Sequence, residues 1–358
     1  MTALVSATVE AAALRHNLAV VRRLAPNSRV MAVIKANAYG HGLVAVARAL
    51  DGADAFAVAR LEEGVSLRQA GISAPIVLLE GVFDAEQLEA AARFGFELVV
   101  HIPEQIEFLR HAPGGATFRI WLKLDSGMNR LGLKGPQFAA AAAALASLAC
   151  VRQPIRLFTH LACADEPRLA ATTEQLERFG AATRGMTGER SVANSAGLLG
   201  FPGAQADWVR PGLLLYGVSP LPGSTGSDHG LRPAMTLRSR IIAVKDVAIG
   251  EQEGYGGRWT AQRATRLAIA AVGYGDGYPR SLGSGAPVLV NGVRAALAGR
   301  VSMDMIGIDV TDLDAPARGD AVILWGEGLP VEEIARRSGT IPYELLCGIS
   351  QRVAVELR

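Results

Sequence analysis

Short apolar runs alternate with amphipathic stretches from residue 30 to about residue 216. The runs are rich in β-branched residues, which favour strands, and they occupy residues 30–34, 55–59, 76–79, 97–100, 118–124, 155–159, 191–193 and 213–216. Between them, segments such as 61–70, 85–94 and 173–182 place apolar residues at helical spacing. Eight strands separated by helices predict an α/β fold of the (β/α)8, TIM-barrel type, with a doubly wound open sheet as the alternative.

The pattern changes after Pro220. Residues 221–228 are rich in Pro, Gly and Ser and predict a linker. Beyond the linker, strand-like runs follow one another without long helices between them. The strands are expected at 235–247, 267–272, 287–298 and 321–325, with a hairpin turn at Asn291-Gly292. A single helix is expected late in the chain, at 331–338. We therefore expect two domains, a barrel over residues 1–230 and a mostly β domain over residues 231–358.

Composition narrows the class of partner. A chain of 358 residues, half of them apolar, is long enough for two domains with large cores. Its formal net charge of +2 gives no reason to expect nucleic acid or an anionic membrane as a partner, so the substrate is expected to be small. The longest uncharged apolar tract, 138–151, is alanine-rich and shorter than the roughly 20 residues of a membrane span, which predicts a packed helix.

Cysteine usage and the N-terminus favour a cytoplasmic protein. The three cysteines, Cys150, Cys163 and Cys347, have no C-x-x-C spacing, which argues against a disulfide framework and a structural zinc site. No basic segment followed by an apolar stretch opens the chain, and Glu10 interrupts the region where such a stretch would lie. Export is therefore not expected.

Two motifs suggest ligands that the sequence does not support. Residues 273–277 (Gly-Tyr-Gly-Asp-Gly) resemble a phosphate loop, but Pro279 follows them and no helix is expected there, so no dinucleotide site is predicted. Asp309, Asp312 and Asp314 lack the ligand spacing of an oxygen-rich metal loop and are interpreted as a solvated turn. No metal is predicted.

Lys35 ends the first of the predicted strands. At the end of a buried strand, desolvation favours the neutral amine, which can condense with an aldehyde as a Schiff base. Tyr39 follows four residues later with a hydroxyl for an anion, and Gly40 and Gly42 allow close approach of the backbone. A lysine whose amine merely reaches solvent is the structural alternative.

Polar residues also follow the other predicted strands, where barrel enzymes carry their active sites. Taken singly, His160 could be a core histidine, Arg210 a salt-bridged residue and Ser195 a helix cap. Together with Lys35 and the cations Lys123 and Arg130, they indicate an anion-binding site with a nucleophilic amine.

These motifs resemble the pyridoxal-phosphate-dependent alanine racemases of bacteria over nearly the whole chain. Residues 33–42 are similar to the cofactor-lysine signature of that family. The later motifs follow in the family's order, at 123–130, 159–162 (Thr-His-Leu-Ala), 194–197 (Asn-Ser-Ala-Gly), 209–212 (Val-Arg-Pro-Gly), 254–257 (Gly-Tyr-Gly-Gly), 273–278, 299–304 and 343–344.

The resemblance implies a two-base mechanism in a homodimer with shared active sites. Lys35 would hold pyridoxal 5′-phosphate as a Schiff base and act as a base on one face of the substrate Cα. Tyr255 would be the base on the other face, assisted by His160, and would come from the second subunit. Racemisation needs a proton acceptor on each face, so a monomer is expected to be inactive.

The resemblance also assigns cofactor contacts. Arg210 would face the pyridine nitrogen and keep it unprotonated, which weakens the ring as an electron sink and favours racemisation over transamination or decarboxylation. The remaining cofactor contacts implied by the family are Tyr39, Asn194, Ser195, Tyr343 and the backbone amides of Gly212 and Leu213.

Substrate contacts are implied in the same way. Arg130 would bind the substrate carboxylate or the phenolic oxygen of the cofactor, and the backbone amide of Met303 would reach the carboxylate from the partner subunit. Lys123 matches a lysine that some relatives carbamylate to position this arginine. The entrance residues implied by the family are Asp165, Tyr274, Arg280, Arg300 and Tyr343, and Ser302 stands where some relatives carry a cysteine.

The function implied is interconversion of L- and D-alanine, either supplying D-alanine for cell-wall peptidoglycan or degrading it. Racemisation of serine or of several amino acids is the nearest alternative. A decarboxylase or aldolase on the same barrel would not be expected to combine Arg210 with the segment 254–257. A carrier protein for the cofactor would need only the barrel, whereas this chain has a second domain.

Overall fold

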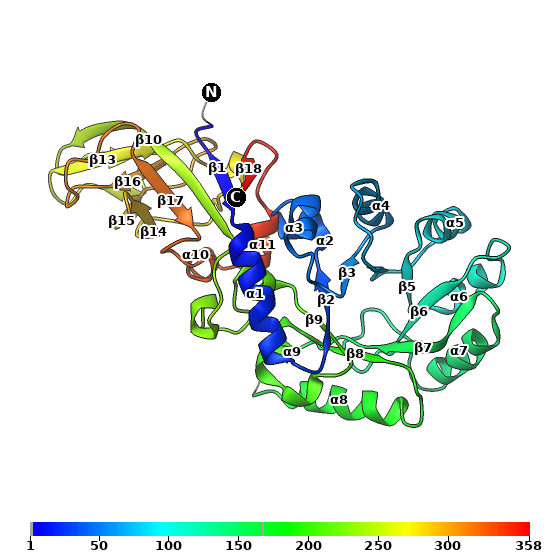
Figure 1. Ribbon diagram of the computed structural model, residues 1–358. Helices are drawn as coiled ribbons and strands as arrows, with labels where there is room; N and C mark the ends of the chain where they lie inside the picture. Colours follow the sequence, from blue (N-terminus) through cyan, green and yellow to red (C-terminus); the bar gives the residue numbers. More distant parts are fainter. Residues whose placement is uncertain (1–2, 167) are drawn as a thin grey trace.

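The computed structural model describes residues 3–166 and 168–358, and its centre is a closed barrel of parallel strands (Figure 1). The barrel strands are β2 (Arg29–Val33), β3 (Ala55–Val58), β4 (Ile76–Leu78), β5 (Glu97–Val100), β6 (Phe118–Lys123), β7 (Val151–Phe158), β8 (Arg190–Asn194) and β9 (Trp208–Arg210). Closure of the ring between β9 and β2 confirms the predicted barrel and excludes the open sheet.

Helices surround the barrel on its outer side (Figure 1). They are α3 (Leu43–Ala49), α4 (Leu61–Gln69), α5 (Ala85–Phe94), α6 (Pro103–Arg110), α7 (Gly135–Ser147), α8 (Ala171–Ala182) and the short α9 (Ser195–Gly200). Helix α5 shows why they begin and end where they do: Asp84 caps its first turn by accepting a hydrogen bond from the Gln87 amide at 2.7 Å, and left-handed Gly95 ends it. The described residues include no helix both long and apolar enough to cross a membrane.

The predicted eighth strand was wrong. Residues Leu213–Tyr216 form the 3-10 helix η2, and the last barrel strand lies earlier, at Trp208–Arg210. All four residues of η2 are buried, at 1% exposure or less, and a short run buried on every side cannot be assigned to strand or helix by its apolar pattern. The alanine-rich tract 138–151 also differs from its prediction, because helix α7 ends at Ser147 and β7 begins at Val151.

The C-terminal domain is built on an eight-stranded sheet, in agreement with the predicted mostly β character. Asn291 and Gly292 form the predicted hairpin turn with φ of 48° and 82°. The sheet has the order β13 (Thr265–Ala270), β16 (Ile306–Asp309), β15 (Val293–Ala298), β14 (Pro287–Val290), β17 (Ala321–Trp325), β10 (Met235–Val247), β1 (Ser6–Val9) and β18 (Ala354–Leu357). Helices α10 (Val331–Ser338) and α11 (Pro342–Cys347) follow β17.

Strand β1, which the sequence pattern did not reveal, joins the two ends of the chain to the same sheet. It pairs antiparallel with β10 and parallel with β18. Helix α1 (Ala11–Leu24) then leads from this sheet towards the barrel (Figure 1). The predicted division at residue 230 groups Ser6–Val9 with the barrel, whereas their backbone hydrogen bonds belong to the C-terminal sheet.

Candidate active site

A cavity of about 590 Å³ lies where the barrel strands end. It is lined by most of the residues expected at a site from the sequence, namely Lys35, Tyr39, Lys123, Arg130, His160, Asn194, Ser195, Arg210, Gly212 and Tyr343. All but Tyr343 come from the barrel strands or from the loops and turns that follow them, and Tyr343 comes from α11. Segments far apart in the sequence therefore meet at one site.

The chain turns left-handed directly after β2. Segment α2 (Lys35–Tyr39) contains four consecutive non-glycine residues, Ala36, Asn37, Ala38 and Tyr39, with φ of 52° to 54°. This conformation costs an L-residue roughly 1–2 kcal/mol. Hydrogen bonds fix it, because the amide of Ala36 donates to the Glu63 carboxylate at 2.6 Å and the side chain of Asn37 accepts from an amide at 2.9 Å. The turn places Lys35 and Tyr39 on the same cavity.

Arg210 is held rigidly beneath the cavity. Its guanidinium donates to the hydroxyl of Ser191 at 2.6 Å and to the carbonyls of Thr159 and Val192 at 2.5 and 3.1 Å. Its central carbon lies 3.8 Å from the centroid of the Phe158 ring. Burial lowers the pKa of Arg210.

His160 is neutral beside this arginine. Burial, together with the charges of Arg210 and Lys123, lowers the pKa of His160 well below its usual value. Because a guanidinium can only donate, Nδ1 of His160 accepts at 3.4 Å from Arg210, and the ring proton belongs on Nε2. Lys123 is affected in the same way: burial and the nearby guanidinium groups of Arg210 and Arg130 lower its pKa to about 8.

One end of the cavity offers hydroxyl groups and backbone amides. The amide of Gly212 donates to the hydroxyl of Ser195 at 2.9 Å. Residue 212 also lies close to Tyr39, because a β-carbon there would be 2.5 Å from the Tyr39 hydroxyl oxygen. Burial raises the pKa of Tyr39, and burial with the charge of Asp165 raises the pKa of Tyr343 to about 12. Neutral donors around a glycine fit a phosphate group.

Apart from Tyr343, the expected site residues of the C-terminal domain do not line this cavity. Tyr255 is 74% exposed and Met303 52% exposed. The segments that carry them contact one another. The amide of Gly275 donates to the Met303 carbonyl at 2.9 Å, and a β-carbon at Gly256 would lie 3.9 Å from the Arg300 guanidinium. Tyr274, the exposed Arg280 and half-buried Arg300 belong to these same segments. Large exposed side chains gathered on one surface are typical of a contact with another molecule.

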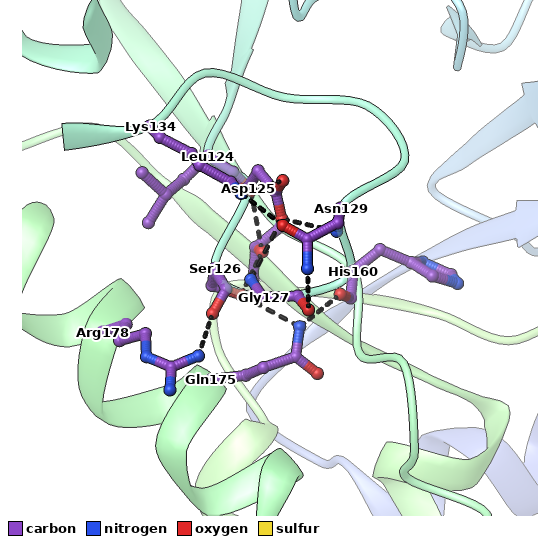
Figure 2. Close-up of polar contacts among 10 residues, drawn as sticks. Leu124, Asp125, Ser126, Gly127, Asn129, Lys134, His160, Gln175 and Arg178 are labelled. Carbon is purple, nitrogen blue, oxygen red and sulfur yellow. Dashed lines mark hydrogen bonds and ion pairs between the residues drawn. The ribbon is translucent and has the colours of Figure 1, made fainter.

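The loop that carries Arg130 is fixed by Asp125 (Figure 2). The Asp125 carboxylate accepts from the amides of Gly127 and Asn129, each at 3.0 Å, and Lys134 lies 3.5 Å from it. Burial opposes ionisation, but these amides prevail and lower the pKa of Asp125. The Asp125 carboxylate therefore fixes the backbone of residues 125–129.

Sequence reasoning missed several residues of the site. Phe158 precedes His160 by two positions, and alternation along a strand could have placed both on the interior. No sequence signal marks Glu63 or Gln175, because a polar residue on an amphipathic helix usually faces solvent. Leu213, expected as a backbone donor, is fully buried at the start of η2 and does not line the cavity.

Comparison with known proteins identifies the family. Residues 9–220 match the N-terminal domain of alanine racemase, and residues 234–357 match the C-terminal domain. The chain is 50% identical to an alanine racemase of Aeromonas hydrophila over 350 residues, 98% of each chain. It resembles the crystal structure of the biosynthetic alanine racemase of Pseudomonas aeruginosa with a TM-score of 0.96 and 46% identity, and the alanine racemase structure of Acinetobacter baumannii with a TM-score of 0.94 and 37% identity, over the full length of all chains. The chain therefore belongs to the alanine racemase family.

Proposed function

We propose that this chain interconverts L- and D-alanine with pyridoxal 5′-phosphate, in a homodimer whose active sites are shared between subunits. The observation that carries the proposal is the cavity in which Lys35 meets buried Arg210 and a group of neutral phosphate donors. Membership of the alanine racemase family supports alanine as the substrate.

The residues present fit the cofactor. Lys35 would link it covalently, Arg210 would face its ring nitrogen, and the phosphate would be held by a set of neutral donors, namely Tyr39, Ser195, Tyr343 and the backbone amides of Gly212 and Leu213, beside Asn194. When bound, pyridoxal phosphate supplies an electron sink that acidifies the α-proton of the amino acid. The protein must then bind, orient and move that proton.

Two bases would move the proton between the faces of Cα. The amine of Lys35 would act on one face, and the hydroxyl of Tyr255 of the partner subunit on the other. A tyrosine of ordinary pKa is a weak base at neutral pH, so it needs a neighbour to share its proton. His160 is suited to this because it is neutral and its Nε2 remains available while Nδ1 faces Arg210.

Arg210 would restrict the chemistry. Its guanidinium is fixed by three acceptors from β7 and β8 and cannot turn away from the cavity without breaking those hydrogen bonds. A cation held against the ring nitrogen disfavours protonation there, so the electron sink is weaker and side reactions such as transamination are limited.

Arg130 and the backbone amide of Met303 of the partner subunit would bind the substrate carboxylate. The entrance would be formed by Asp165 and Tyr343 of one subunit and by Tyr274, Arg280 and Arg300 of the other. The exposure of Tyr255, Tyr274 and Met303 in the single chain supports this shared arrangement. We further propose that the enzyme works in the cytoplasm, where Cys150, Cys163 and Cys347 would remain the free thiols that the structure contains.

The test is to purify the chain with pyridoxal phosphate and to follow formation of the D-isomer from L-alanine and, in parallel, from L-serine. We expect rapid racemisation of alanine and much slower racemisation of serine. Borohydride reduction should fix the cofactor covalently on the protein, and peptide mapping should then find it on Lys35. Absence of D-alanine, or attachment of the cofactor at another lysine, would refute the proposal. Equal rates of racemisation for alanine and serine would show that the enzyme accepts a broader range of substrates than alanine alone.

A further inference from the structure

We propose that Gln175 is a positioning residue that fixes His160 and the loop bearing Arg130 relative to each other. The inference rests on the proposed function, because it assigns Gln175 to the same site. Gln175 lies on α8, outside the barrel, and is only 2% exposed. Figure 2 shows its side chain between the end of β7 and the loop after β6.

The amide group of Gln175 is engaged at both ends. Its nitrogen donates to the carbonyl of His160 at 3.0 Å and to the hydroxyl of Ser126 at 3.2 Å. Its oxygen accepts from the amide of Ala162 at 2.8 Å. One side chain therefore holds the backbone on both sides of Leu161 and also reaches the neighbouring loop.

The contact to Ser126 starts a chain of hydrogen bonds. Thr159 donates its hydroxyl to the Leu124 carbonyl at 2.9 Å, so the Ser126 hydroxyl donates to Thr159, at 2.8 Å. The order from Gln175 through Ser126 and Thr159 to Leu124 joins α8, the Arg130 loop and the residues that directly follow β7 and β6. Each hydroxyl donates and accepts at once, which strengthens the chain and fixes its direction.

The loop also packs directly on α8. A β-carbon at Gly127 would lie 3.3 Å from Cγ of Gln175 and 2.8 Å from a guanidinium nitrogen of Arg178. Arg178 donates to the Ser126 carbonyl at 3.1 Å (Figure 2). The position of Arg130, four residues after Ser126, is therefore set from α8 as well as by the Asp125 turn.

A carboxylate or an apolar side chain cannot replace this amide. Gln175→Glu keeps the size and the acceptor for Ala162 but loses both donors, and it places an oxygen against the His160 carbonyl. Gln175→Met keeps the length and loses all three hydrogen bonds. Either change lets His160 and the Arg130 loop move independently, and a misplacement of about 1 Å costs a catalytic group about 100-fold in rate.

His160 assists only one of the two proposed bases, which gives a readout that general loss of stability would not produce. In the proposed mechanism, Tyr255 of the partner subunit would remove the label from α-deuterated L-alanine, and Lys35 would remove it from α-deuterated D-alanine. If the tyrosine step slows, the isotope effect on kcat/KM rises for L-alanine and falls towards one for D-alanine. Displacement of Arg130 should raise KM in both directions.

Gln105 on α6 (Pro103–Arg110) provides a matched control. It is 1% exposed, its nitrogen donates to the carbonyls of Glu80 and Val82 at 3.0 and 3.3 Å, and its oxygen accepts from the His101 amide at 2.8 Å. The same nitrogen also lies 3.3 Å from Nε2 of His101, so Gln105→Met removes four hydrogen bonds at another pair of strand ends, one more than Gln175→Met. It does not touch His160 or the Arg130 loop.

The experiment compares the wild-type holoenzyme with Gln175→Met, Gln175→Glu and Gln105→Met, using both deuterated isomers. We expect kcat/KM to fall about tenfold to 100-fold in both Gln175 variants, with a raised isotope effect for L-alanine alone. Gln105→Met should leave the two isotope effects at their wild-type values. If a folded Gln175→Glu enzyme showed unchanged isotope effects, or effects raised equally for L- and D-alanine, the inference would be overturned and the proposed function would remain intact. An inactive wild-type holoenzyme would overturn both.

Discussion

The backbone of Gly212 approaches the hydroxyl of Tyr39 so closely that a β-carbon at residue 212 would lie 2.5 Å from that oxygen. Tyr39 cannot easily move aside, because its ring lies 4.8 Å from the ring of Tyr216 and 5.8 Å from that of Tyr343. Both Gly212 and Tyr39 line the part of the cavity proposed for the cofactor phosphate. The close approach therefore favours glycine at this position, where φ is −116° and not left-handed.

Gly212→Ala should weaken binding of pyridoxal phosphate. Overpacking at a tight contact costs about 1–3 kcal/mol, which corresponds to a rise in Kd of about fivefold to 150-fold. The measurement is a titration of cofactor-free protein with pyridoxal phosphate. Gly203→Ala is the control, because a β-carbon there would meet nothing within 4 Å. Equal affinities of the two variants would contradict the role given to Gly212.

Ala36→Gly should not destabilise the protein in the way that Ala→Gly changes usually do. Ala36 has φ of 53°, a conformation that costs alanine roughly 1–2 kcal/mol and glycine almost nothing. This gain offsets the greater entropy that glycine loses on folding, about 0.5–1 kcal/mol. The free energy of unfolding in urea should therefore stay constant or rise, whereas Ala143→Gly on the exposed face of α7 should lower it by about 1 kcal/mol. Equal losses at both positions would argue against the left-handed turn.

Inactive subunits should complement each other if the sites are shared. In a heterodimer of Lys35→Ala and Tyr255→Phe chains, one site contains both intact residues and the other contains neither. Random exchange gives half heterodimers, so about a quarter of the wild-type activity should return. The measurement is racemisation after mixing, with exchange verified by a mass tag on one chain. Proven exchange without recovery would place both bases on one chain.

Lys123 should form a carbamate. Its amine lies among the cations Arg210 and Arg130 and has a pKa of about 8, so the neutral form that attacks CO2 becomes dominant above that pH. The ammonium group loses one proton to give the neutral amine. Attack of this amine on CO2 forms an N–C bond, converts one C=O bond of CO2 into a carboxylate C–O bond and releases a second proton. The group thereby changes from a repelled cation to an anion that can pair with Arg130. Under 13C-labelled bicarbonate, a carbamate resonance should grow as pH rises. It should be absent in Lys123→Gln and present in the control Lys134→Gln, and its persistence in Lys123→Gln would assign it elsewhere.

Most of the barrel and much of the site could be predicted from local sequence. Parallel strands buried on both faces give continuous apolar runs, and the rule that barrel sites follow strand ends located Lys35 and His160. Arg210 was expected just before the predicted eighth strand, whereas it ends β9. The eighth strand was misplaced because Trp208–Arg210 is short and is followed by the longer apolar run of η2. Local pattern favoured the wrong segment.

Features that depend on distant partners could not be predicted. Strand β1 is defined by pairing with β10 and β18, more than 200 residues away. The left-handed turn at Ala36 depends on the carboxylate of Glu63. A run of alanine and asparagine residues does not by itself predict such a turn. The role proposed for Gln175 depends on two loops meeting at α8. Such information lies in tertiary packing rather than in residue spacing.

Stability should fall between pH 6.5 and pH 4 because of His41. The imidazole is 1% exposed and its Nδ1 donates to the carbonyl of Tyr39 at 2.8 Å, which leaves the unprotonated Nε2 buried without a hydrogen-bond partner among the described residues. Burial lowers its pKa to about 4. In this window the unfolded chain binds a proton that the folded chain does not, so the free energy of unfolding decreases as pH falls, by about 3 kcal/mol at pH 4.

The share that belongs to His41 can be isolated by substitution. His41→Asn keeps a donor near the Tyr39 carbonyl and removes the titrating ring, so its unfolding free energy should lose about 3 kcal/mol less than that of the wild type between pH 7 and pH 4. Urea unfolding at the two pH values measures the difference, and contributions of the carboxylates cancel between the two proteins. His111→Asn, at an exposed position, should follow the wild type. If His41→Asn also followed the wild type, the imidazole of His41 would have to be protonated in the folded protein, and the apolar contact with the Tyr216 ring, 4.5 Å away, would have to open.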